Sequence, residues 1–151
     1  MGANKANDNT DYVNYGNARP SEDLSTHEYR LVYFDASVQP TLLDDATQVA
    51  AQKRRPMVLV RGGNTDDLVE CADTGIQKVI PGTGGLALGD YVVPEAGTGK
   101  AIAATSLAAG DYFLGVCVQA GSADGNALVD CDRGGRVVGA STKTGTLTTN
   151  T

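Results

Sequence analysis

Strongly hydrophobic residues are concentrated in the middle of the chain. Leu, Ile, Val and Phe number 32 of 151 residues, and 29 of them lie between residues 28 and 138. Residues 1–27 contain two of them and residues 139–151 contain one. Segments so poor in apolar side chains bury too little surface to fold alone. The pattern predicts one domain over 28–138, an extended N-terminal arm over 1–27 and a C-terminal tail over 139–151.

One stretch near the start of this domain has helical spacing. Between Leu42 and Ala50, apolar residues recur three and four positions apart. Thr41 can cap the first turn, and Pro56 ends the run. Acidic residues near the start and three basic residues near the end complement the helix dipole; the basic residues are Lys53, Arg54 and Arg55. We expect one short helix over 41–53, and the basic cluster is a candidate contact with another subunit.

The rest of the domain reads as short strands separated by glycine, proline and aspartate. The candidate strands are rich in β-branched and aromatic residues, and turns recur every 8–12 residues. These strands span 28–35, 57–61, 68–71, 76–80, 91–93, 100–104, 112–119, 127–132 and 136–138. This spacing is typical of small all-β domains. The sequence therefore predicts a mainly β fold, either a small β-barrel or a β-sandwich, with extended polar arms.

The net charge and the composition argue against two classes of partner, nucleic acids and membranes. The formal net charge is -6, and an acidic domain gains nothing from counterion release on nucleic acid. No apolar stretch approaches the roughly 18 residues that a transmembrane helix needs, and the N-terminus carries no hydrophobic run typical of a signal peptide. We expect no binding to nucleic acid and no insertion into a membrane.

Residues with reactive or metal-binding side chains are few. The three cysteines, Cys71, Cys117 and Cys131, form no CxxC pair, and His27 is the only histidine. We expect buried free thiols, although a bond between Cys117 and Cys131 stays open. An enzyme that uses Cys117 or Cys131 as its nucleophile is a rival interpretation, but we expect no catalytic residue, no cofactor and no metal.

Four short motifs resemble ligand-binding loops only in part. Residues 97–100 (GTGK) lack the leading glycine and the final hydroxyl of a phosphate-binding loop, and a strand follows where a helix should begin. Residues 82–87 (GTGGLA) match a dinucleotide-binding pattern but are also followed by a turn and a strand. Residues 123–126 and 130–132 contain too few acidic groups for a calcium loop. We interpret all four as turns.

Four segments in the second half of the chain resemble a known family. They are rich in Gly, Ala and Val, and they read GGLALGDYVV at 84–93, GKA at 99–101, AGDYFLGVCVQAGSADG at 109–125 and ALVDC at 127–131. This pattern of Gly, Ala and Val resembles the sequences of the small capsid decoration (cement) proteins of tailed bacteriophages. Cys117 and Gln119 depart from the family, which usually has Ala and Glu there.

The resemblance implies a virion structural protein made in the host cytoplasm. Such a protein binds the outer capsid surface and stabilises contacts between subunits of the major capsid protein, usually as a homo-oligomer. The arm would then make intersubunit contacts through its densest apolar group, Tyr12, Val13 and Tyr15, since strand addition satisfies the backbone of an arm that cannot fold alone. A tail or adaptor protein of the same virion is a related alternative.

A carbohydrate- or cell-surface-binding β-module, such as a head fibre, is a rival of a different class. It would need exposed aromatic rings for stacking on sugars. Because the chain has no Trp and only two Phe, its six Tyr would have to supply them.

Overall fold

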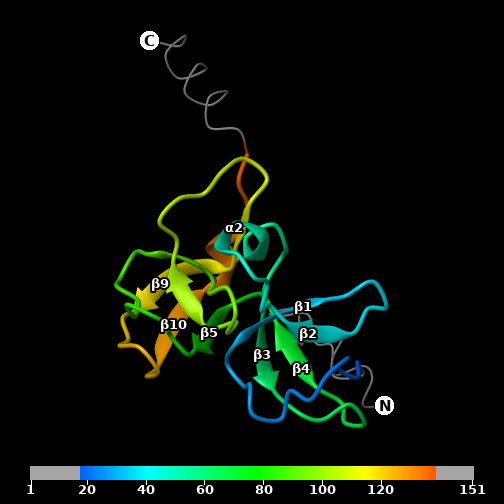
Figure 1. Ribbon diagram of the computed structural model, residues 1–151. Helices are drawn as coiled ribbons and strands as arrows, with labels where there is room; N and C mark the ends of the chain where they lie inside the picture. The colour runs from blue at the N-terminus through cyan, green and yellow to red at the C-terminus, as the bar shows by residue number, and fades with distance from the viewer. Residues whose placement is uncertain (1–17, 139–151) are drawn as a thin grey trace, which may run out of the picture.

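The computed structural model describes residues 18–138 (Figure 1). This range contains the whole of the predicted β domain and the end of the predicted arm, residues 18–27. Tyr12, Val13 and Tyr15 of the arm, and the predicted tail over 139–151, lie outside the described residues.

Two antiparallel sheets form the framework of this part of the chain. The first has the strand order β2-β1-β3-β4, with bounds β1 Leu31–Phe34, β2 Pro40–Leu42, β3 Met57–Arg61 and β4 Glu70–Ala72. The second has the order β5-β10-β9-β6-β7, with bounds β5 Ile76–Val79, β6 Tyr91–Pro94, β7 Ala101–Ala103, β9 Gly115–Gln119 and β10 Ala127–Asp130.

Three shorter elements complete the fold. Strands β8 (Tyr112–Phe113) and β11 (Gly135–Arg136) pair with each other, and a 3-10 helix, η1, spans Cys131–Arg133. Neither larger sheet closes on itself within the described residues. The mainly β prediction is therefore confirmed, and of the two predicted architectures the sandwich fits.

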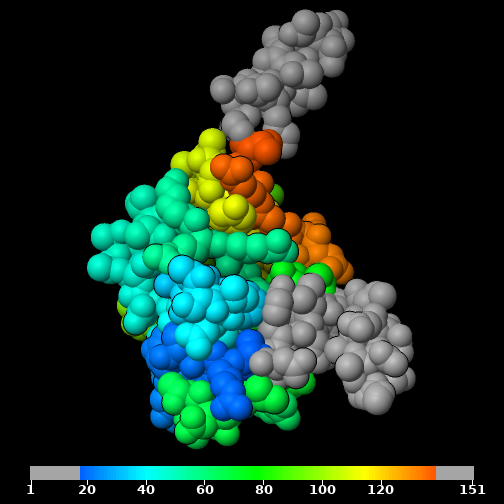
Figure 2. Space-filling model, turned by 90° about the vertical axis from the view of Figure 1, so that its right-hand side faces the viewer, coloured from blue at the N-terminus to red at the C-terminus, as the bar shows by residue number. Residues whose placement is uncertain are grey.

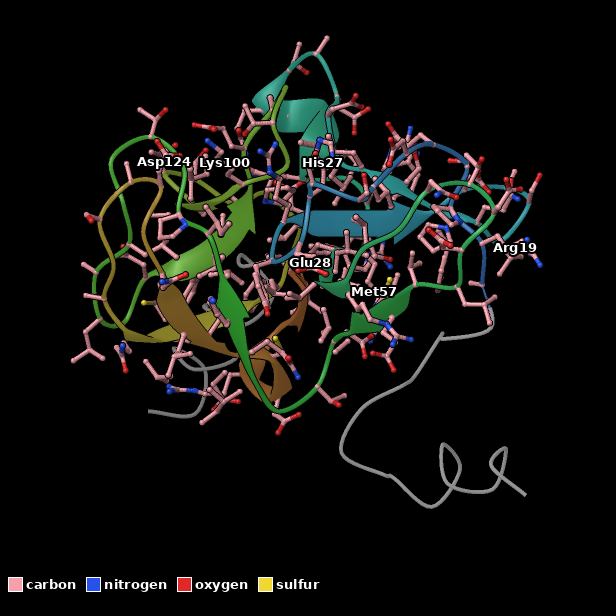
Figure 3. The ribbon with its side chains drawn as sticks, turned by 90° about the horizontal axis from the view of Figure 1, so that it is seen from below. Arg19, His27, Glu28, Met57, Lys100 and Asp124 are labelled. Atoms are coloured by element: carbon pink, nitrogen blue, oxygen red, sulfur yellow. The ribbon has the colours of Figure 1, made fainter. Side chains whose placement is uncertain are left out.

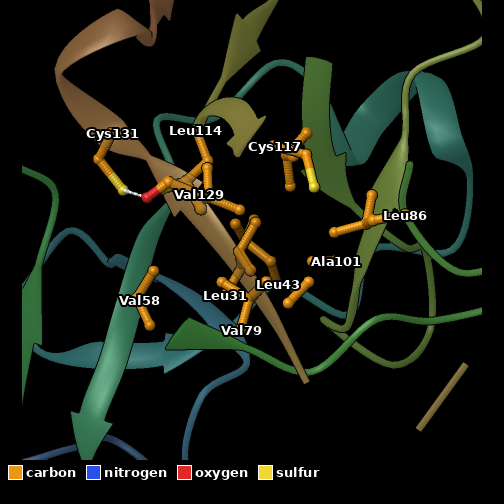
Figure 4. Packing of buried hydrophobic residues seen from close by; sticks show 12 residues of the cluster. Leu31, Leu43, Val58, Val79, Leu86, Ala101, Leu114, Cys117, Val129 and Cys131 are labelled. Atoms are coloured by element: carbon orange, nitrogen blue, oxygen red, sulfur yellow. Dashed lines mark hydrogen bonds between the residues drawn. The ribbon is translucent and has the colours of Figure 1, made fainter. Parts of the chain in front are cut away.

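The larger core lies between the two sheets. Leu31 of β1 and Val58 of β3 meet residues of the second sheet, including Val92, Cys117 and Val129, and all are at most 1% exposed (Figure 4). Since successive residues of a strand point to opposite faces, their chain neighbours point away from this core. The first sheet therefore buries its other face against something else.

That second face is covered partly by the chain that precedes β1. Leu24, which is 0% exposed, packs in a second core with Val32, Leu59 and other residues of the first sheet. The Leu24 N–H donates to the Gly63 carbonyl oxygen (2.8 Å). Figure 2 shows this first described segment, in blue, against the green loop before β4. Residues 18–27 therefore belong to the folded part, which thus begins before the predicted boundary at residue 28.

The predicted helix is much shorter than its pattern suggested. Helix α2 spans only Gln48–Ala51, with Thr47 as its cap, and Thr41 lies in strand β2 instead. No acidic residue lies in its first turn and no basic residue in its last. The predicted bounds of 41–53, and the predicted match between charges and helix dipole, were thus wrong.

The apolar positions that predicted the helix face different surroundings. Leu42 pairs with Val32 in the first sheet, whereas Val49 is 67% exposed. The buried side of α2 is formed instead by Ala51 and by the C-cap residue Gln52, which is 5% exposed.

Candidate functional site

Each residue of the predicted basic cluster is paired with an acidic residue of its own chain. Lys53 Nζ lies 2.5 Å from Asp111 Oδ1, and Arg55 Nη2 lies 2.6 Å from Asp73 Oδ2. Arg54 Nε lies 3.3 Å from Asp45 Oδ2, and its guanidinium stands 4.2 Å from the centre of the Tyr33 ring.

These pairs give the cluster a structural role. Three consecutive side chains reach three separate acidic partners, so their charges are largely neutralised within the chain. Exposed ion pairs contribute little to stability, but Asp73 and Asp111 have side chains only 8% and 5% exposed. A contact of Lys53, Arg54 and Arg55 with another subunit remains a prediction.

Asp111 is the centre of the best-developed buried polar network. Its Oδ2 accepts hydrogen bonds from the Ala108 N–H (2.8 Å) and from Gln52 Nε2 (3.2 Å). The hydrogen bond from Lys53 is the main cause that lowers the pKa of this carboxyl below its ordinary value, against the opposing effect of burial. Gln48 extends the network, because its Nε2 donates both to Gln52 Oε1 and to the Pro94 carbonyl oxygen. The network fixes α2 to the loop before β8 and to the end of β6.

The two glycine-rich loops surround a carboxylate. Glu95 Oε2 accepts a hydrogen bond from the Thr83 N–H (3.0 Å), and its Oε1 accepts one from the Thr98 hydroxyl (2.6 Å). Burial raises the pKa of Glu95, but the hydrogen bonds from Thr98 and Thr83 outweigh it and the net direction is down. A negative charge therefore lies between the two loops, and it would repel a phosphate bound there. Residues 95–100 connect the antiparallel strands β6 and β7, as the predicted hairpin turn requires.

The acidic turns also have internal partners. Asp124 Oδ1 lies 2.5 Å from Lys100 Nζ (Figure 3). Asp130 caps η1, and Asp132 Oδ1 accepts a hydrogen bond from the Gly75 N–H (2.9 Å). Within residues 18–138, no group of three or more His, Cys, Asp or Glu residues is placed to hold a metal ion.

All three cysteines are free and buried. Burial, reinforced by the nearby Asp73, raises the pKa of Cys71 and of Cys131 to about 12. Burial is also the main cause that raises the pKa of Cys117. Thiols in this state carry almost no thiolate at neutral pH, and the thiolate is the nucleophilic form.

The most exposed apolar surface of the second sheet lies on the side opposite the larger core. Cross-strand pairing places Ile76, Asp130, Val116 and Tyr91 in one row across four strands. Ile76 is 60% exposed and Tyr91 is 53% exposed. We call this side of the sheet the outer face, and by strand alternation it also carries the half-buried Val118 and Leu128.

An aromatic pair forms one end of the outer face. The Tyr91 and Phe113 rings stack with centroids 5.2 Å apart and an angle of 15° between their planes. Beside them Val93 is 0% exposed, because α2 packs against β6 there. The outer face thus presents apolar side chains that are partly open to solvent, beside the charged Lys78 and Asp130.

The outer face was not identified from the sequence. Its residues lie in predicted strands, but those strands are apolar on both sides, so alternation alone does not tell which set faces outward. The exposure of Ile76 and Tyr91 depends on which side the first sheet covers.

Among residues 18–138, no helix is long and apolar enough to cross a membrane. The chain matches no protein-family model and no curated protein sequence. The features that bear on its function are therefore its fold, its charges and the outer face.

Proposed function

We propose that the chain is a capsid decoration protein of a tailed bacteriophage, which binds the outer surface of the major capsid protein and stabilises contacts between its subunits. The segments that carry the resemblance to this family lie mainly in one sheet. Residues 84–93 include most of β6, residues 109–125 include β9, and residues 127–131 include β10. The similarity thus concerns a connected structural unit.

The observation that carries the proposal is the outer face of that same unit. An antiparallel sheet often leaves one face to water, and that face is then mostly polar. Here it carries Ile76, Tyr91, Val118 and Leu128 beside the charged Lys78 and Asp130. Apolar side chains grouped on a sheet and bordered by charges suit contact with a large partner surface.

Decoration of this kind needs no chemical reaction. Each copy would contact two or more capsid subunits, and the second contact would be intramolecular, with an effective concentration of about millimolar. The N-terminal arm adds reach, since an extended chain spans about 3.3 Å per residue. The acidic surface favours basic patches on the capsid exterior over packaged DNA.

The proposal is tested by attachment to capsids that lack the protein. Purified protein is mixed with such particles, and the bound fraction is measured after sedimentation. We expect Ile76→Ala and Tyr91→Ala to weaken attachment about tenfold or more, as truncation of central interface residues does. Val38→Ala is the matched control, because Val38 is similarly exposed (67%) but lies in the first sheet's β1–β2 turn. Equal attachment of all three variants would refute a role of the outer face.

A carbohydrate-binding module is a second candidate, favoured by the Tyr91–Phe113 pair. An exposed ring held in place by a second ring is a suitable platform for the apolar face of a sugar. A glycan array with the intact protein and with Tyr91→Ala separates the two proposals. Specific glycan binding that the variant loses supports this second function, and no binding on the array counts against it.

A further inference from the structure

A groove of about 140 Å³ opens between the two sheets, and it is lined by Val60, Glu70, Ala72 and Gln77. Ala72 of β4 pairs with Val58, which belongs to the larger core. Gln77 of β5 pairs with Val129 of the same core. Because directly opposed residues of an antiparallel pair lie on the same face, Ala72 and Gln77 both face the space between the sheets. The groove is therefore an opening at the edge of the larger core.

The lining combines apolar side chains with two groups that accept hydrogen bonds. Ala72 is 1% exposed, and Val60 is half-buried at a bulge where β3 has one residue more than β4. The Glu70 side chain is 30% exposed. Gln77 Nε2 donates to the Thr74 carbonyl oxygen (2.8 Å), which fixes the amide and leaves Oε1 as an acceptor. The groove thus offers an apolar wall, a carboxylate and an amide oxygen.

The Glu70 carboxylate is held only loosely by its own chain. Arg61 Nε lies 3.6 Å from Glu70 Oε2, which is longer than a hydrogen bond. The Arg61 side chain is 60% exposed, and exposed ion pairs of this kind contribute little to stability. Glu70 can therefore bind a second cation without the loss of a strong internal bond.

The volume of the groove limits the size of its occupant. Sites for cofactors and drug-sized ligands have about 300–1,000 Å³, whereas a cavity of about 150 Å³ holds one benzene-sized group. The groove is thus too small for a nucleotide or an oligosaccharide, and it suits a single side chain. Single side chains that fill pockets supply much of the binding energy of protein interfaces.

We infer that the groove holds the side chain of one lysine of a partner protein. The apolar stem of that lysine would lie on Val60 and Ala72, and its ammonium group would donate to the Glu70 carboxylate and to Gln77 Oε1. An ammonium group has three donors and no acceptor, and its compact charge on a flexible stem suits a narrow site better than a planar guanidinium does. The formal net charge of -6 attracts a basic partner to this chain before contact.

This inference deepens the proposed function, and only the identity of the partner rests on that function. Ile76 and Lys78 of β5 belong to the outer face, whereas Gln77 between them points into the groove. The groove is therefore a contact on the other side of β5. A decoration protein that bridges two capsid subunits needs two such separate contacts.

An NMR titration of the full, isotope-labelled chain tests the groove with two short peptides. An acetylated and amidated Gly-Lys-Gly peptide carries the inferred side chain, and the same peptide with norleucine keeps the stem but lacks the ammonium group. We expect the lysine peptide to shift the amide signals of Glu70, Ala72 and Gln77. It should reach half-saturation at a concentration at least about fivefold lower than the norleucine peptide, which is the effect of about one hydrogen bond to a charged group. Equal half-saturation, or no shift of these signals by the lysine peptide, would overturn the inference.

Two variants show whether Glu70 is responsible for this preference. Glu70→Gln removes the charge at nearly constant size, and it should make the two peptides bind about equally. Asp44→Asn is the matched control, because Asp44 is an exposed carboxylate in the segment between β2 and α2, and it should leave the preference unchanged. A preference for lysine that survives in Glu70→Gln would contradict the groove as the site. The titration involves no capsid, so its failure is distinct from failure of the proposed function, which the sedimentation assay measures.

Discussion

Replacement of Leu24 by alanine tests whether the folded part begins before residue 28. Leu24 is 0% exposed and packs with Val32, Leu42 and Leu59 in the second core. The sequence pattern instead places it in a polar arm, where the same substitution would have almost no effect. The two interpretations therefore predict different free energies of unfolding.

The expected magnitude depends on the buried volume that is lost. Leu→Ala removes three carbon atoms, worth about 0.8 kcal/mol each by transfer alone. The cavity left behind adds to this, and buried Leu→Ala substitutions cost about 2.7–5 kcal/mol. We expect a loss of about 3 kcal/mol, a large part of the roughly 5–15 kcal/mol that stabilises an ordinary domain.

Urea denaturation followed by circular dichroism measures this loss. The midpoint should fall by about 1–3 M at an unchanged slope, because small proteins have slopes of about 1–3 kcal/mol per M. Leu88→Ala is the control, since Leu88 is 73% exposed. If Leu24→Ala is no less stable than Leu88→Ala, residues 18–27 are not part of the folded domain.

Three further predictions concern the network, the thiols and the arm. The hydrogen bond from Lys53 lowers the pKa of Asp111. The contribution of this bond to folding stability is therefore complete above the ordinary aspartate pKa and is lost as pH falls through the lowered value. Between about pH 5 and about pH 2, denaturation curves should show a smaller loss of stability for Asp111→Asn than for the intact protein. In the native protein Cys71 and Cys131 should not react with iodoacetamide at about pH 8, because their pKa values are about 12, and rapid labelling of either thiol detected by peptide mass spectrometry would contradict their burial. Deletion of residues 2–17 should leave a folded domain by circular dichroism but weaken sedimentation with capsids, whereas deletion through residue 25 should also destabilise the fold.

The sequence predicted strands where apolar runs are short and bounded by turn residues. The run over 57–61 coincides with β3, and the run at 91–93 falls within β6. The predicted strand over 112–119 is divided, because β8 and β9 pair with different partners on either side of Leu114. Such divisions depend on tertiary pairing that local patterns do not contain.

The helix shows why spacing alone is insufficient. Leu42 contributes to the apolar period, but its place is in a strand opposite Val32. The buried side of α2 is held by hydrogen bonds of Gln48 and Gln52, which a hydrophobic pattern counts as polar and therefore exposed. Long-range partners such as Asp111 decide which face turns inward.

The candidate surface was less predictable than the fold. In the sequence the basic cluster looked like a free patch. Two of its acidic partners, Asp111 and Asp73, are distant along the chain from Lys53 and Arg55. The exposure of Tyr91 and Ile76 depends on which side of the second sheet meets the first. Neither fact is encoded in local spacing.

Electron microscopy of purified phage particles that carry this chain tests directly whether it decorates the capsid. We expect density for the β domain on the outer capsid surface, in contact with two or more major capsid subunits, with the outer face of the second sheet toward the capsid. Particles without the protein should lose DNA at a lower temperature. Density confined to the tail, or particles that resist heat equally well without the protein, would contradict the proposed function.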